Sequence, residues 1–140
     1  DRPMRCLAKG RARGQLVGGN LSLVVSTLGT PWEIDTRHKL LFLEDVDEEP
    51  YRIDRMLLQL KQAGKLSDCD GILLGDFTNC EPENPARSLT IEEVLRELLL
   101  DECKPVLTHV ACGHSMPTMS LPLGLNAMMD ATAGTLTILE

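Results

Sequence analysis

A short apolar run that ends abruptly at an acidic cluster is the feature that most constrains how this chain can fold. Leu40 to Leu43 is continuously apolar, which is typical of a strand covered on both faces. Five acids follow within the six residues from Glu44 to Glu49. Pro50 is well placed as the first residue of a helix, and an apolar stripe at helical spacing continues to Gly64. The pattern predicts a buried strand that ends at Glu44 and leads into an amphipathic helix.

The same kind of patterning predicts the remaining elements. A strand or bent hairpin is expected over residues 4–17, and further strands over residues 70–77, 104–110 and 125–140. Gly18 and Gly19 are expected to break the first strand before a helix capped by Asn20, and a capping box of Thr90 and Glu93 begins another helix. Proline and glycine mark residues 78–88 and 111–124 as loops. These elements predict a single α/β domain in which helices pack on a mixed sheet.

Length and charge exclude several classes of protein. At 140 residues the chain has the size of one domain, and it begins at Asp1 rather than Met, so we expect a piece of a longer protein. A formal net charge of −7, with scattered Lys and Arg, argues against a nucleic-acid partner. No apolar run approaches the roughly 20 residues that span a bilayer, and no leader opens the chain, so we expect a cytoplasmic protein without membrane association.

Two polar residues that follow apolar strands are the strongest candidates for catalysis. Glu44 and His114 each come after a predicted strand, and ligands of α/β folds usually bind where strands end. A carboxylate that orients an imidazole forms two members of a nucleophilic triad, in which the imidazole takes a proton from Ser or Cys. The structural alternatives are a helix-capping or solvated role for Glu44 and a turn role for His114. Spacing alone does not decide between them.

The nucleophile of such a triad is not evident in the sequence. No G-x-S-x-G elbow is present, and Ser115 adjoins His114, where neighbouring side chains diverge. Ser22 is expected to cap or pack a helix. Cys112 is a candidate thiol whose more common fate is burial, and a zinc site of Cys112 and His114 lacks a second ligand pair. Five cysteines, an odd number without a C-x-x-C pair, indicate a reducing compartment rather than a disulfide framework.

Three other ring-bearing side chains are assigned from their positions. Trp32 is the only tryptophan, and it serves either as a loop anchor or as a stacking surface for a ligand. His38 is expected on a loop surface and His109 inside a strand.

Five motifs in register resemble the C-terminal domain of the LD-carboxypeptidases, also called muramoyl-tetrapeptide carboxypeptidases, and of the related microcin-immunity peptidases. In order, these motifs are "GGNLSLV" with "GTPW", "LLFLEDVDEEPYRIDRMLLQL", "AGKL", "GILLGDF", and "GH" followed by "LPLG". Together they cover nearly the whole chain.

The resemblance implies a swivelling β/β/α domain that supplies Glu44 and His114 to a Ser-His-Glu triad. The serine and its oxyanion hole would lie on an N-terminal domain that is absent here, so the chain alone would be inactive. The implied reaction removes a C-terminal D-amino acid from a peptidoglycan tetrapeptide during cytoplasmic wall recycling, with no metal or other cofactor. The alternatives are a microcin-immunity peptidase that cleaves a peptidyl-adenylate analogue, and a non-catalytic module that binds a peptide or partner.

The implied two-domain protein also predicts which surfaces this chain uses. Trp32 and Asn20 are expected on the substrate side. Asp45 and the acids that follow it are expected to be helix-start charges or to line the binding cleft. An apolar patch around Leu21, Trp32 and residues 116–123 is expected where the missing domain would lie, so we expect self-association, as a homodimer, through that patch.

Overall fold

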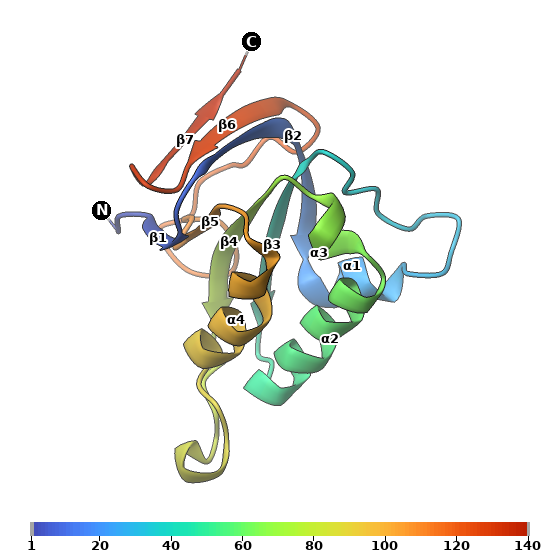
Figure 1. The fold of residues 1–140 in the computed structure, drawn as a ribbon. Helices are drawn as coiled ribbons and strands as arrows, with labels where there is room; N and C mark the ends of the chain where they lie inside the picture. The colour runs from blue at the N-terminus through green and yellow to red at the C-terminus, as the bar shows by residue number, and fades with distance from the viewer. Residues whose placement is uncertain (1, 140) are drawn as a thin grey trace.

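One seven-stranded sheet organises residues 2–139, which are the residues that the computed structural model describes (Figure 1). The strands are β1 (Arg5–Ala8), β2 (Arg11–Asn20), β3 (Leu40–Val46), β4 (Gly71–Thr78), β5 (Val106–Thr108), β6 (Asn126–Asp130) and β7 (Thr135–Ile138). The helices are α1 (Leu21–Ser26), α2 (Pro50–Gln62), α3 (Lys65–Asp68) and α4 (Ile91–Leu99). The predicted fold class, an α/β domain with helices packed on a mixed sheet, is confirmed.

The strand order places four parallel strands at the centre of the sheet. The order is β1-β5-β4-β3-β2-β6-β7, in which β2, β3, β4 and β5 are parallel, whereas β1, β6 and β7 pair antiparallel with their neighbours. The carboxyl ends of β3 and β4 therefore share one edge of the sheet, which is the lower edge in Figure 1. The yellow loop before α4 extends beyond this edge.

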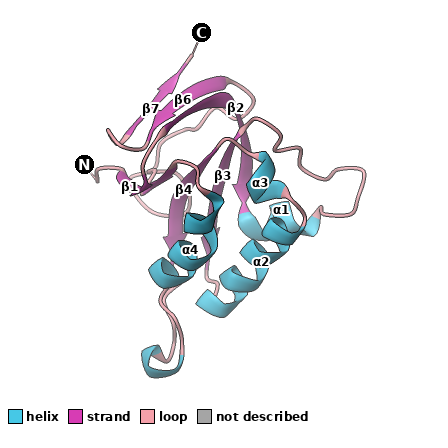
Figure 2. Ribbon diagram, viewed as in Figure 1, coloured by secondary structure: helices cyan, strands magenta, loops and turns pink. Residues whose placement is uncertain are grey.

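Two hydrophobic cores cover the two faces of the sheet. All four helices pack on one face, where Leu41, Leu43 and Leu74 meet apolar side chains of the helices (Figure 2). On the opposite face, Phe42 and Leu73 pack with residues of β2 and β6. Because successive side chains of a strand point to opposite faces, β3 contributes to both cores, which explains its unbroken apolar run.

Local sequence signals account for the helix ends. The Asn20 side chain accepts a hydrogen bond from the Leu23 N–H and caps α1. Thr90 and Glu93 form the predicted capping box at the start of α4, and the apolar stripe of this helix is buried. Pro50 is the first residue of α2, and Gly64 has a φ of 80° after the helix ends. These capping predictions are confirmed.

Glycines 18 and 19 do not break the first strand, contrary to the prediction. β2 continues to Asn20 because it pairs in parallel with β3, in the register Gly18 to Phe42 and Asn20 to Glu44. A Cβ at Gly18 would lie 1.9 Å from the Phe42 carbonyl oxygen. The glycine therefore permits a close approach between two strands.

Three other predicted boundaries also differ from the structure. β1 and β2 do not form a hairpin, because β1 pairs with β5 at the far side of the sheet. β3 does not end at Glu44 but continues to Val46. β5 ends at Thr108, and His109, expected inside a strand, follows it with a left-handed φ of 62°. Hydrogen bonds to neighbouring strands decide these boundaries, and they depend on residues far away in the sequence.

Candidate active site

Glu44 lies opposite an irregularity in the pairing of β3 with β4. The register runs from Leu43 opposite Leu74 to Asp45 opposite Phe77, so Glu44 faces two residues of β4, Gly75 and Asp76. Such a bulge re-aims side chains at the end of a strand. Glu44 is on the same face of β3 as Phe42 by strand alternation, opposite the helices. The carboxylate is thus directed to the side of the sheet where the loop after β5 passes.

His114 comes from that loop and meets Glu44. The His114 Nδ1 and Glu44 Oε2 atoms are 2.8 Å apart, although the residues are 70 positions apart in the sequence. The Glu44 side chain is 8% exposed and the His114 side chain 51% exposed. A buried carboxylate that accepts the Nδ1 proton leaves Nε2 as the proton acceptor, on a ring that solvent and substrate can reach. The expected juxtaposition of the two side chains is present.

Gly113 is required for this approach. Its φ is 143°, and a Cβ built there would lie 3.2 Å from Glu44 Oε2 and 3.2 Å from Asp76 Cβ. The chain therefore passes between two buried acids immediately before His114. Any side chain at this position would displace the loop that carries the imidazole.

Asp45 has a different role from the one that the sequence suggested. Instead of starting α2 or lining a cleft, it is buried and accepts hydrogen bonds from the Ser22 N–H at 3.0 Å and the Ser22 hydroxyl at 2.7 Å. Asn20 donates to the same carboxylate at 3.2 Å. Asp45 therefore joins the end of β3 to the start of α1. The capping role expected of Ser22 is wrong, because Asn20 is the N-cap and Ser22 lies inside the first turn, where its N–H and hydroxyl donate to Asp45.

Asp76 is a buried acid that sequence reasoning missed. It is 5% exposed, and its carboxylate accepts a hydrogen bond from the Arg2 guanidinium at 3.3 Å. The signal that could have found it is the one that found Glu44, because Asp76 also follows a buried apolar run. An acid at the end of a second strand brings further negative charge to the site, which Arg2 offsets.

The alternative nucleophiles are poorly placed or poorly ionised. The Ser115 hydroxyl lies 2.6 Å from the Thr78 hydroxyl, so its hydrogen bond is made to β4 and not to the His114 ring. Burial, followed by the nearby Glu44 and Asp76 carboxylates, raises the pKa of the Cys112 thiol above its ordinary value. A thiol with a raised pKa is a weak nucleophile at neutral pH. Among residues 2–139, no group of three or more His, Cys, Asp or Glu side chains is arranged to hold a metal ion.

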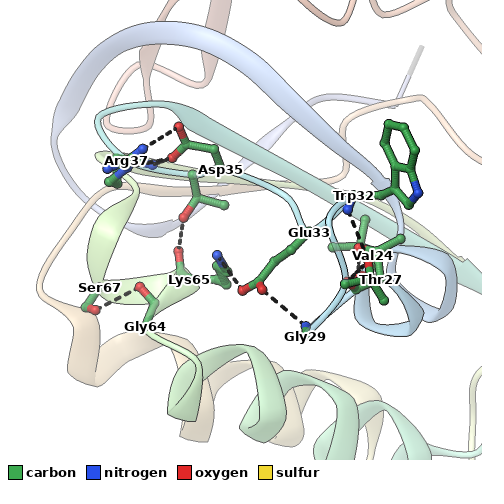
Figure 3. Close-up of polar contacts among 12 residues, drawn as sticks. Val24, Thr27, Gly29, Trp32, Glu33, Asp35, Arg37, Gly64, Lys65 and Ser67 are labelled. Atoms are coloured by element: carbon green, nitrogen blue, oxygen red, sulfur yellow. Dashed lines mark hydrogen bonds and ion pairs between the residues drawn. The ribbon is translucent and has the colours of Figure 1, made fainter.

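Trp32 lies in the loop after α1 with its ring 84% exposed. Figure 3 shows the ring directed away from the hydrogen-bonded loop, whose Glu33 side chain accepts from the Gly29 N–H and forms an ion pair with Lys65 at 2.8 Å. The Trp32 N–H donates to the Thr30 hydroxyl at 3.2 Å. The backbone of the loop is thus fixed while the indole remains available to a ligand or partner.

A shallow groove connects Trp32 with Asn20. Leu23 and Leu123 also line this groove, whose volume is about 670 Å³. Leu23 and Leu123 are 68% and 48% exposed, whereas Leu21, which we expected in an exposed patch, is fully buried in the helix-side core. Of the expected patch, Trp32 and Leu123 line this groove. Leu23 takes the place of Leu21, because the Leu21 face of the short helix α1 packs on the sheet.

Comparison with known proteins identifies the family. A family model described as the LD-carboxypeptidase C-terminal domain matches residues 13–129. The chain belongs to this family. The predicted family membership is therefore confirmed, and the family is one of carboxypeptidases.

Relatives of this LD-carboxypeptidase domain are larger proteins. The probable murein peptide carboxypeptidase of Bacillus subtilis (strain 168) is 52% identical over 136 residues, which cover 97% of this chain and 43% of the relative. The microcin C7 self-immunity protein MccF of Escherichia coli is 29% identical over 132 residues, 94% of this chain and 38% of the relative. The crystal structure of muramoyltetrapeptide carboxypeptidase from Oxalobacter formigenes has a TM-score of 0.83 and 31% identity, and covers 97% of this chain and 49% of that chain. The chain thus spans less than half the length of these proteins.

No helix in the described part of the chain, residues 2–139, is long and apolar enough to cross a membrane.

Proposed function

We propose that this chain is the C-terminal half of a serine LD-carboxypeptidase, in which Glu44 and His114 are two members of a Ser-His-Glu triad. The observation that carries the proposal is the 2.8 Å contact between His114 Nδ1 and the buried Glu44 carboxylate. A carboxylate on Nδ1 holds the imidazole in the tautomer that accepts a proton at Nε2, and stabilises the imidazolium that forms. The family resemblance assigns the serine to a preceding half, so this chain alone is inactive.

In the proposed reaction, His114 transfers one proton in each of two half-reactions. Nε2 takes the proton of the serine hydroxyl as the serine oxygen attacks the carbonyl carbon before the terminal D-amino acid. The tetrahedral intermediate collapses, the peptide C–N bond breaks, and His114 gives the proton to the departing amine. Water then attacks the acyl-enzyme while His114 takes one of its protons. The bond between the acyl carbon and the serine oxygen breaks, and His114 gives that proton to the serine oxygen, which releases the shortened peptide and restores the serine. Neither step needs a metal or another cofactor.

A peptidoglycan tetrapeptide is the favoured substrate. Identity to the probable murein peptide carboxypeptidase is 52%, against 29% to the microcin C7 self-immunity protein, over similar shares of this chain. We therefore place the reaction in murein recycling in the cytoplasm. Trp32 and Asn20, which line one groove, are the proposed substrate-side residues of this half.

The exposed apolar groove also suggests where a partner packs. Leu23, Trp32 and Leu123 form an apolar surface of the kind that marks interaction sites. We propose that the preceding half of the same protein covers this surface, and that the 140-residue chain alone self-associates through it. Sedimentation of the 140-residue chain and its Leu23→Ser variant tests this, and equal monomer content in both would contradict it.

The test of the function is release of D-alanine from a muropeptide that ends in D-alanine. The complete protein is compared with the 140-residue chain, with the Glu44→Gln and His114→Ala variants, and with controls of the same residue types at exposed positions, Glu97→Gln and His38→Ala. We expect turnover by the complete protein and by both controls, and none by the 140-residue chain or by His114→Ala. Turnover by the 140-residue chain would contradict the proposal, since the nucleophile would then lie within it.

The same proteins also separate the alternatives. An aspartyl sulfamoyl adenosine substrate that is cleaved in preference to the muropeptide would assign the chain to the microcin-immunity branch. A complete protein that binds muropeptide but cleaves neither compound would indicate a non-catalytic binding module.

A further inference from the structure

His114 belongs to a segment without regular secondary structure, and this raises the question of what fixes its position. The segment from His109 to Leu125 connects β5 with β6 and contains no strand or helix. The Glu44 carboxylate orients the His114 ring through Nδ1, but one bond to a half-exposed ring does not fix the backbone that carries it. Other contacts must therefore hold the loop.

The end of β4 supplies these contacts. The Val110 N–H donates to the Leu74 carbonyl oxygen at 3.1 Å, and the Asp76 N–H donates to the Cys112 carbonyl oxygen at 3.1 Å. After β5 has ended, two backbone hydrogen bonds thus still join the chain to β4. Between them the chain makes a tight turn, in which the Cys112 N–H donates to the Val110 carbonyl oxygen at 2.6 Å. This alignment brings the loop as far as Cys112.

The backbone alignment ends at Gly113, one residue before His114. Gly113 adopts a φ of 143° to pass between Glu44 and Asp76. The next contact between the loop and β4 is made by side chains, because the Ser115 and Thr78 hydroxyl oxygens are 2.6 Å apart in a partly buried position. His114 is therefore held on both sides by β4, through the backbone at Cys112 and through the hydroxyl pair at Ser115.

We propose that Thr78 and Ser115 are positioning residues for His114. Their hydroxyl pair fixes the backbone after His114, so that the ring keeps its bond to Glu44 while Nε2 is directed to the nucleophile of the preceding half. This inference rests on the proposed function, because it assigns a role relative to the catalytic base. Neither hydroxyl takes part in proton transfer.

The test uses the complete protein, with Thr78→Val and Ser115→Ala as the variants that remove one hydroxyl each. Misplacement of a catalytic group by about 1 Å can cost on the order of 100-fold in rate, so we expect each variant to lower kcat about 10- to 100-fold, with KM changed less than about twofold. The double variant should be little worse than either single one, because both remove the same bond. Thr78→Ser keeps the hydroxyl and should restore most of the loss.

The matched controls are Thr137→Val on β7 and Ser67→Ala on α3, whose side chains are exposed and belong to other elements. A readout specific to positioning is the proton resonance of His114 Nδ1–H, assigned by its loss in His114→Ala. We expect it to broaden or vanish in Thr78→Val and Ser115→Ala, and to persist in Thr78→Ser and in both controls. Thermal melts of every variant separate this effect from unfolding.

Several results would overturn the inference. These are a kcat for Thr78→Val and Ser115→Ala within twofold of the controls, an unchanged His114 resonance, or a Thr78→Ser variant no better than Thr78→Val. Glu44→Gln and His114→Ala, measured in parallel, distinguish this outcome from failure of the proposed function. If those two variants lose activity and the hydroxyl variants do not, only the positioning role fails. If Glu44→Gln and His114→Ala also remain active, the proposed function fails, and the positioning role with it.

Discussion

Replacement of Glu44 by glutamine isolates the charge of the carboxylate from its shape. Glutamine has nearly the same volume and keeps an oxygen that can accept the Nδ1 proton of His114, so the 2.8 Å contact can persist. The negative charge is lost. That charge matters most in the transition state, when His114 has taken the serine proton and carries a positive charge.

The size of the loss in kcat follows from the distance between the Glu44 and His114 charges and from the burial of Glu44. Two unit charges about 4 Å apart interact by about 4 kcal/mol at an effective dielectric constant of about 20, which suits a pair with one half-exposed partner. Because 1.36 kcal/mol corresponds to a tenfold change in rate, Glu44→Gln should lower kcat by about 10³-fold. KM should change little, since the charge pair forms only during the chemical step.

The assay is steady-state release of D-alanine by the complete protein at pH 7, with Glu97→Gln as the control for loss of an exposed acid. The ratio of the wild-type kcat to the Glu44→Gln kcat should change only slightly between low and high sodium chloride concentration, because Glu44 is largely shielded from solvent. A Glu44→Gln enzyme as fast as wild type would refute the reasoning. A variant with unchanged kcat and raised KM would place Glu44 in substrate binding instead.

Other expectations concern the loop, the surface and the thiols. Gly113→Ala should destabilise the fold by about 1–3 kcal/mol in urea unfolding, because alanine must adopt a φ of 143° and displace its neighbours. The Lys65 ammonium lowers the pKa of Glu33 below its ordinary 4.5. The ionised Glu33 side chain therefore stabilises the fold above pH 4.5, and this stabilisation is lost as the pH falls below that value. The stability difference between wild type and Glu33→Gln should therefore fade in acid, and a constant difference would contradict the assignment. Burial raises the pKa of Cys69 to about 11, so iodoacetamide at pH 8 should alkylate the exposed Cys6 and leave Cys69 unmodified, as mass spectrometry of peptides will show.

The features that the sequence predicted correctly are those set by local chemistry or by strand direction. The Thr90 capping box depends on residues three positions apart, and its prediction is confirmed. Glu44 and His114 follow parallel strands, whose carboxyl ends share one edge, so their meeting could be anticipated despite their distance in the sequence.

The features that it missed depend on contacts between distant segments. Gly18 appeared to be a strand breaker, but it permits the close pairing of β2 with β3. Asp45 appeared to be one of several helix-start charges, but it binds Asn20 of β2 and Ser22 of α1. The bulge opposite Glu44 has no signature in either strand alone, because it is a property of the pairing. Composition and spacing do not encode such partners.

The most direct test of the role of Glu44 and His114 is the distance between His114 Nε2 and the hydroxyl oxygen of the nucleophilic serine in a crystal structure of the complete protein. If the two residues belong to a Ser-His-Glu triad, the two atoms lie within hydrogen-bond reach, about 2.6–3.2 Å and somewhat longer without substrate, while Glu44 remains bonded to Nδ1. A complete protein in which His114 Nε2 faces solvent, or meets a surface that contains no serine, cysteine or threonine side chain, would contradict it.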